Sequence, residues 1–216
     1  MDMIAEDGIV TGGGIDLLTA QQDRFVNETY SSVDEVTRCE LNRLYSEEGV
    51  VPSCKPGCFE CCGQHIQVNI VEAKALTRYI NQEFSQGKIE DLRIRTQKWL
   101  KWDKTRRFQS QSPSRSRQPV LDPHLYCPML VEGECSVYPM RPVICRGHFV
   151  RSAPPACRPF YESDSTGDYP VILKSVLKAA NQFSSRFKDL IEGAGLNFSG
   201  SILLLPHWLA IEMNWE

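Results

Sequence analysis

The sequence predicts a mainly α fold, in which three to five helices frame two irregular cysteine-rich loops that converge on a metal site. Hydrophobic residues make up 42% of the 216-residue chain and charged residues 24%, as expected for a globular protein with a core. Apolar side chains recur with helical spacing in several stretches, whereas proline, glycine and most cysteines gather in two stretches that lack it. We therefore expect one domain, 1–216, with a cysteine-cluster metal-binding region at 54–148.

The first predicted helix lies within residues 1–50, which contain eleven acidic and three basic residues. Thr19 and Gln22 form a capping box at its start, and Gly49 provides a left-handed stop. We expect the helix to bury one side. The apolar positions on that side are Val26, Tyr30, Val33, Leu41 and Leu44.

Two further helices are predicted after the first cysteine-rich stretch. One begins with the capping pair Asn69 and Glu72 and ends at Gly87. The next spans 88–108, where apolar residues including Leu92 and Trp99 can pack. Serine, proline and arginine then replace the apolar periodicity, which predicts a mobile basic loop at about 109–119.

The remainder of the chain alternates between irregular and helical patterns. Segment 122–160 is rich in proline, and no regular element of useful length is expected there. Helical spacing returns from Val171 to Ile191 and stops at Gly193. A short apolar helix is predicted to start near Pro206.

Seven cysteines in the two irregular stretches form a candidate metal-binding set. Glycine lets a loop curl its side chains toward a common point, and proline restricts the backbone between ligands. The N-terminal sequence MDMIAEDGIVTGGG lacks the basic and apolar regions of a signal peptide, so we expect a cytoplasmic protein. In that reducing compartment, nine cysteines are more often metal-binding or catalytic than paired in disulfides. The candidate ligands are Cys54, Cys58, Cys61, Cys62, Cys127, Cys135 and Cys145.

This pattern resembles the YkgJ-type cysteine-cluster family, also called the CxxCxxCC domain. The resemblance covers roughly residues 54–148 and is carried by CKPGCFECC, CPML and CSVYPMRPVICR. The first gap has three residues where the family pattern has two, which bears on Cys54 more than on Cys58. The resemblance implies a chelated zinc or iron, or an iron-sulfur cluster, and it implies no particular reaction.

Thiolate chemistry points to the same cofactors, zinc or iron, the latter including a 4Fe-4S cluster. A four-thiolate centre carries a net charge of about −2, and Arg141 and Arg146 are expected to stand behind the ligands and offset it. Seven ligands are more than one four-ligand centre needs and one fewer than two such centres need. His148 is the best-placed extra ligand. His65, Cys39 and Cys157 are alternatives, although Cys39 within the first helix is more simply a buried core thiol.

Two classes of function fit these residues. One is a metal-binding protein. In the simplest form of this function, a closed zinc site only stabilises a loop-rich region. The other is an iron-sulfur-dependent redox or protein-modifying enzyme, although no catalytic residue is assigned and enzymatic activity is left open. The spacing of Cys54, Cys58 and Cys61 also matches radical S-adenosylmethionine enzymes, but the strand–helix alternation of their barrel is missing.

The metal ion is the expected partner. Residues 88–117 hold ten basic and three acidic residues with aromatic residues between them, a pattern that favours a solvated helix face over more than weak nucleic-acid binding. No apolar run approaches the roughly 18 residues of a membrane span, so no membrane partner is expected. Trp208 and Trp215 near the C-terminus are expected to be core residues or an oligomer contact.

Overall fold

The computed structural model describes residues 20–55, 57–110, 125–157 and 170–215. The fold is mainly α, as the sequence predicted. The helices are α1 (Ala20–Glu48), α2 (Ile70–Glu83), α3 (Gln86–Ser110), α4 (Val143–Gly147), α5 (Lys174–Asn181), α6 (Ser184–Gly193) and α7 (Leu205–Glu212).

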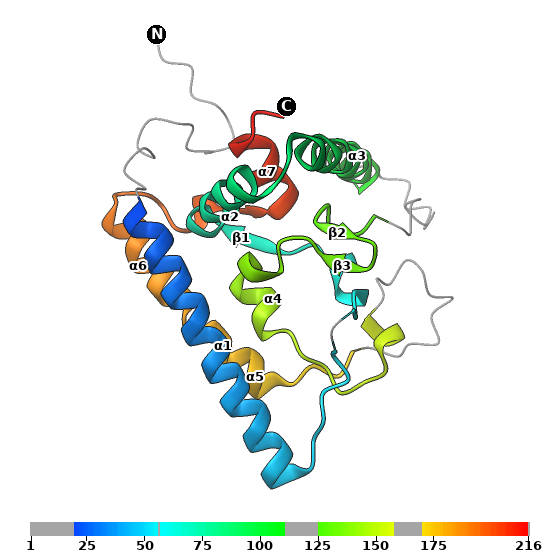
Figure 1. Ribbon diagram of the computed structural model, residues 1–216, viewed down its shortest axis with the longest axis vertical. Coiled ribbons are helices and arrows are strands. Elements are labelled where there is room, and N and C mark those ends of the chain that lie inside the picture. The colour runs from blue at the N-terminus through cyan, green and yellow to red at the C-terminus, as the bar shows by residue number, and fades with distance from the viewer. Residues whose placement is uncertain (1–19, 56, 111–124, 158–169, 216) are drawn as a thin grey trace.

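The helices surround a central short helix, α4. Figure 1 shows α1 as a long helix along one side, with α5 and α6 beside it and α2, α3 and α7 gathered at the top of the view. Helix α4 contacts both α1 and α5, and α7 contacts both α2 and α3. On the other side of α4 lies a hairpin of β2 (Leu130–Val131) and β3 (Glu134–Cys135). The cysteine-bearing segments are therefore held against the helical frame through α4.

Helix α1 buries the side that its sequence predicted. Val26, Tyr30 and Val33 are buried, and the ring of Phe187 from α6 lies 6.5 Å from that of Tyr30. Burying a large apolar side chain contributes about 1.5–3 kcal/mol, so this seam is a major part of the core. The helix ends as predicted, because Gly49 has a φ of 65° and donates its N–H to the Tyr45 carbonyl oxygen. Thr19 lies outside the described residues.

The boundary between α2 and α3 differs from the prediction. Helix α2 starts with the predicted cap, since Asn69 Oδ1 accepts hydrogen bonds from the Val71 and Glu72 N–H groups. It ends at Glu83, because Phe84 adopts an extended backbone. Gly87 does not stop it and instead lies in the first turn of α3, whose range includes the predicted 88–108 and continues to Ser110. Of the predicted basic loop, residues 111–119 lie outside the described ranges.

The single helix predicted for 171–191 is two helices. Ile172 forms an isolated antiparallel bridge with Val150, so α5 begins only at Lys174. Between α5 and α6 the Phe183 N–H bonds to the Ala180 carbonyl, an i→i+3 bond that tightens the turn and separates the helices. Hydrophobic spacing continued through this break, which is why the sequence did not reveal it.

Short regular elements occupy segment 122–160, where no regular element of useful length was expected. Glu132 and Gly133 both have positive φ, 51° and 83°, and connect β2 to β3 as a two-residue hairpin turn. A second antiparallel ribbon pairs β1 (Gln67–Asn69) with β4 (Ile202–Leu204). These strands are too short to give a clear alternating pattern, so periodicity did not predict them.

The C-terminal helix agrees with the prediction. Helix α7 begins at Leu205 with Pro206 in its first turn, and Trp208 and Trp215 are buried in the core. None of the described helices has an apolar stretch long enough to cross a bilayer.

Gly147 at the end of α4 allows close packing against α5. A Cβ atom at this position would lie 2.4 Å from the Cβ of Ala180. We predict that Gly147→Ala lowers the free energy of unfolding by about 1–3 kcal/mol in urea denaturation, because one helix must move. Gly87→Ala is the control, since nothing lies within 4 Å there. Equal stability of the two variants would contradict the close contact.

Candidate metal centre

The first cysteine loop is tied by its backbone to the segment that follows α4. Ser53 donates its N–H to the Val150 carbonyl at 2.9 Å, and the Val150 N–H in turn donates to Cys54 Sγ at 3.4 Å. The loop then ends in a short 3₁₀ helix, Glu60–Gly63, which carries Cys61 and Cys62. Two regions almost a hundred residues apart in the sequence are thereby fixed side by side.

The second cysteine stretch meets the same 3₁₀ helix. The Cys127 N–H donates to the Cys62 carbonyl at 2.8 Å, which joins the two loops directly. Cys135 lies in β3 opposite Leu130, and Cys145 lies in α4. The hairpin and α4 thus bring the later cysteines back toward the first loop.

One cavity of about 420 Å³ collects the thiols from both loops. Its wall also includes His148 and Arg141. Cys127 is not part of the wall, and its thiol is buried, next to the backbone of Cys62. The predicted ligands that line the cavity are Cys54, Cys58, Cys61, Cys62, Cys135 and Cys145.

The thiols surround this cavity without closing on a point. Among the described residues, no three Cys, His, Asp or Glu side chains are already arranged to hold a metal ion. All nine cysteines are free thiols, and Cys62 donates its S–H to Cys61. The donor atoms therefore suit a thiophilic metal in type and location, while their orientations are those of hydrogen-bonded thiols.

Most of these thiols are held in the neutral form. Burial raises the pKa of Cys127 to about 12, and burial followed by repulsion from Cys127 raises the pKa of Cys145 well above its ordinary value. Cys61 is the exception, because the hydrogen bond from Cys62 lowers its pKa to about 7, with help from the Arg141 charge. Cys61 is thus the thiol of this group most readily ionised near neutral pH.

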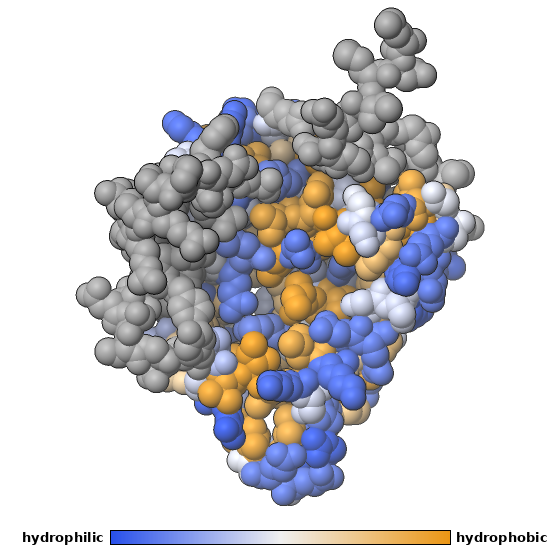
Figure 2. All heavy atoms as spheres, turned by 180° about the vertical axis from the view of Figure 1, so that it is seen from behind, coloured by the Kyte–Doolittle hydropathy of each residue, from blue (hydrophilic) through white to orange (hydrophobic). Residues whose placement is uncertain are grey.

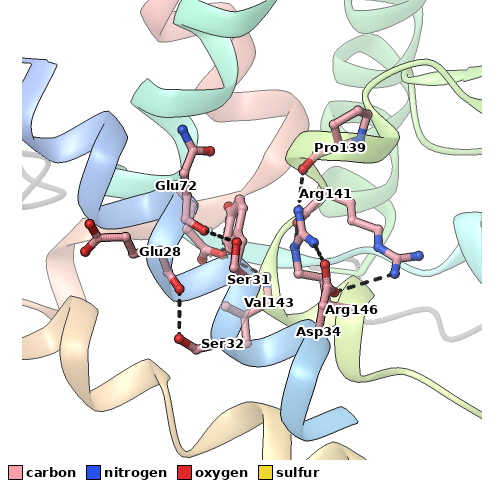
Figure 3. Close-up of polar contacts among 11 residues, drawn as sticks. Glu28, Ser31, Ser32, Asp34, Glu72, Pro139, Arg141, Val143 and Arg146 are labelled. Atoms are coloured by element: carbon pink, nitrogen blue, oxygen red, sulfur yellow. Dashed lines mark hydrogen bonds and ion pairs between the residues drawn. The ribbon is translucent and has the colours of Figure 1, made fainter. Parts of the chain in front are cut away.

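The two arginines occupy different positions. Arg141 lines the cavity and stacks over the ring of Tyr138, with 4.1 Å between the guanidinium carbon and the ring centroid. Arg146 turns toward α1, where Nη1 lies 2.5 Å from Asp34 Oδ2 and other guanidinium nitrogens donate to the Pro139 and Arg141 carbonyls (Figure 3). Arg141 Nη2 also lies 3.9 Å from Asp34 Oδ1, so both arginines pair with α1. Only Arg141 also lines the cavity and can act on the thiols directly.

A buried carboxyl, Glu72, holds three helices together behind the cavity. Its Oε1 accepts hydrogen bonds from the Tyr30 hydroxyl at 3.2 Å and the Val143 N–H at 2.8 Å, and Oε2 accepts from Asn69 Nδ2 at 2.7 Å. Figure 3 shows this carboxyl close to α1 and to the start of α4. Because Val143 opens α4, the carboxyl sets the position of Cys145 two residues later.

The structure places the other candidate ligands, His148 and Cys39, in different surroundings. The His148 ring is partly buried beside the thiols, and its Nε2 has no hydrogen-bond partner among the described residues. Burial lowers its pKa, so the ring is neutral and one nitrogen can coordinate a metal. Cys39 is exposed on α1 and donates to Glu35, so the expectation that it is a core thiol was wrong. Its position on the polar side of an amphipathic helix explains the exposure.

Trp99 and Trp102 of the basic stretch do not form a stacking surface. Trp99 and Trp102 are buried, and the His65 ring packs against them at centroid distances of 5.3 and 4.9 Å. His65 therefore belongs to this aromatic cluster and to a second cavity, not to the thiol-lined one. Bases cannot stack on indoles that are already covered.

Comparison with known proteins adds no relative. No protein-family model, curated protein or solved structure matches the chain. The resemblance to the YkgJ-type family stays a prediction, which rests on the cysteine spacing.

Sequence reasoning assigned Glu72 only to a helix cap and left Cys157 undecided. The signal for Glu72 was present in part, because Asn69 and Glu72 do form a pair at the start of α2. Its bonds to Tyr30 and Val143 join residues 42 and 71 positions away, and local spacing carries no record of such contacts.

Glu72 predicts a pH dependence of stability. Burial raises its pKa above the ordinary value of 4.5, against the opposing effect of its hydrogen-bond donors. The folded state then keeps a proton that the unfolded state loses, so stability from this group falls as pH rises above about 4.5. From pH 4 to pH 7 we expect the unfolding free energy of the wild type to fall relative to that of Glu72→Gln. A difference that stays constant in urea titrations would contradict this.

Proposed function

We propose that the protein binds a thiophilic metal, zinc or iron, in the cavity lined by its cysteines. The observation that carries the proposal is the meeting of two distant cysteine stretches at one cavity. Thiolates prefer zinc and iron-sulfur centres over magnesium or calcium, and a neutral His148 adds a borderline ligand. A metal cation would also offset the burial and mutual repulsion that keep these thiols protonated.

Metal binding would reorient side chains more than backbone. The loops are already joined by backbone hydrogen bonds from Ser53 to Val150 and from Cys127 to Cys62. A cysteine has one side-chain torsion with three staggered positions, so rotation moves its sulfur while the loop stays in place. In this proposal the metal displaces thiol protons and replaces the hydrogen bond between Cys62 and Cys61.

The cellular setting of the proposal is a reducing cytoplasm. Nine free thiols, several of them close together, persist as metal ligands where disulfides are kept reduced. Nucleic acid is not a proposed partner, because the indoles of the basic stretch are buried. The YkgJ-type resemblance is part of the same proposal, since it implies chelated zinc or iron.

A second candidate function is an iron-sulfur-dependent redox or protein-modifying enzyme. The observation that favours it is a second cavity of about 590 Å³, which has no lining residue in common with the thiol-lined cavity but is lined by a sequence neighbour of one of its thiols. Ile144 lines this cavity while the next residue, Cys145, lines the other. In the same way Gln64, just after the 3₁₀ helix, lines this cavity while Cys62, within that helix, lines the other. A substrate there would lie close to a cluster. The strands differ from those of a radical-enzyme barrel, because the described strands pair antiparallel in two short ribbons.

Anaerobic purification distinguishes the two candidates. An iron-sulfur protein is expected to be brown, with iron and inorganic sulfide in equal amounts. A zinc protein is expected to be colourless, with zinc in stoichiometric amount. Both proposals would be overturned if the purified protein contained neither metal and chelator treatment left its melting temperature unchanged.

Removing single thiols tests the metal centre. We predict that Cys58→Ser and Cys145→Ser lower bound metal and the melting temperature together, the latter by about 5 °C or more, because metal binding stabilises the folded state. The measurements are elemental analysis and thermal denaturation of the same preparations. Cys39→Ser is the matched control, since Cys39 is exposed on α1 away from the cavity. Loss of metal in that control alone would contradict the site.

A further inference from the structure

An eighth thiol stands beside the cysteine loops. Cys157 ends a short 3₁₀ helix, Pro154–Cys157, which contacts the helix Glu60–Gly63 (Figure 1). Its side chain is buried, with only 5% of its surface exposed. Burial and the nearby thiols of Cys54, Cys61 and Cys58 raise its pKa to about 11. The segment before Cys157 is held next to the first cysteine loop, because the Val150 and Ser152 carbonyls both accept from the Ser53 hydroxyl.

The thiols fall into two neighbourhoods that meet at the Cys61–Cys62 pair. Cys157 and Cys54 each have Cys58 and Cys61 as electrostatic neighbours. In the second group, Cys145 and Cys62 each have Cys127 and Cys135 as electrostatic neighbours, and Cys61 adjoins this group as well. The backbone bond from Cys127 to Cys62 fixes this second group. The thiols of Cys61 and Cys62 are hydrogen-bonded to each other in this structure. Because consecutive residues of a 3₁₀ helix leave the axis about 120° apart, rotation about the side-chain torsion can direct the two sulfurs to different centres.

We propose that the protein holds two adjacent four-thiolate metal sites, with Cys157 as the eighth ligand. This inference rests on the proposed function and specifies its stoichiometry. Each site takes one divalent thiophilic ion of the zinc type, in tetrahedral coordination. The first site is Cys54, Cys58, Cys61 and Cys157, and the second is Cys62, Cys127, Cys135 and Cys145.

Charge around the two groups supports this division. Eight thiolates and two divalent ions carry a net charge of about −4, which needs nearby cations. Lys55 lines the cavity next to Cys54, and Arg141 lines it near Cys61 and Cys135. Arg95 lies near Cys127 and donates from Nε to the adjacent Pro128 carbonyl at 2.8 Å. Each group therefore has a cation of its own, and Arg141 serves both.

The first test counts sites in the unaltered full-length protein. Chelator-treated, reduced protein is titrated anaerobically with zinc and, separately, with cobalt(II), whose four-thiolate complexes absorb strongly in the visible range. We expect saturation at about two ions per chain, with cobalt spectra of thiolate coordination at both steps. Saturation at one ion, or a single polynuclear cluster holding all the metal, would overturn the two-site inference and leave the proposed function intact. No binding would overturn the proposed function itself.

The second test assigns the ligands. We expect Cys157→Ser and Cys135→Ser each to reduce zinc from about two ions to about one per chain, and the double variant to lose both. Cys39→Ser is expected to keep both ions. If Cys157→Ser keeps two ions while His148→Ala keeps one, the eighth ligand is His148 and the assignment of Cys157 is wrong. Circular dichroism establishes folding, and for a variant that fails to fold, the wild-type titration decides between one site and two.

Discussion

The buried carboxyl of Glu72 is the constraint on which the candidate centre depends. It accepts hydrogen bonds from α1 through Tyr30 and from the first residue of α4 through Val143, while Asn69 holds it at the start of α2. Helix α4 has five residues and could not persist alone, because nucleating a helix is unfavourable. Its place is fixed from outside, by Glu72 at one end and by Arg146 bonded to Asp34 at the other. Cys145 and His148 are positioned by that attachment.

The cavity combines an organised backbone with thiols that resist ionisation. Burial and repulsion among neighbouring thiols oppose charge on Cys127 and Cys145, whereas the bond from Cys62 favours it on Cys61. An isolated group of buried thiolates would be costly, and a bound cation reverses that balance. Folding and metal affinity are coupled through these protons, while the hydrogen bonds between the loops do not depend on them. The frame and the ligands thus have separate sources of stability.

Agreement between sequence and structure was best where one local interaction decides the outcome. The left-handed Gly49 ends α1, Asn69 caps α2, and Pro206 lies in the first turn of α7, all as predicted. Errors arose at element boundaries and at one surface position. Phe84 ends α2 before Gly87, and the bridge from Val150 to Ile172 delays α5. Cys39 was assigned to the core on residue type, although its place on the helix surface leaves it exposed.

The sequence alone determined the helical class, the helix faces that form the core and the two stretches that carry the candidate ligands, because periodicity, caps and cysteine spacing are local properties. Tertiary structure decided which thiols share a cavity, that Arg141 lines it and Arg146 does not, and that Cys157 lies beside the first loop. Those outcomes depend on hydrogen bonds such as Val143 to Glu72 and Cys127 to Cys62, which join residues more than sixty positions apart. Contacts over such separations come from packing the whole chain, and no short pattern of residues encodes them.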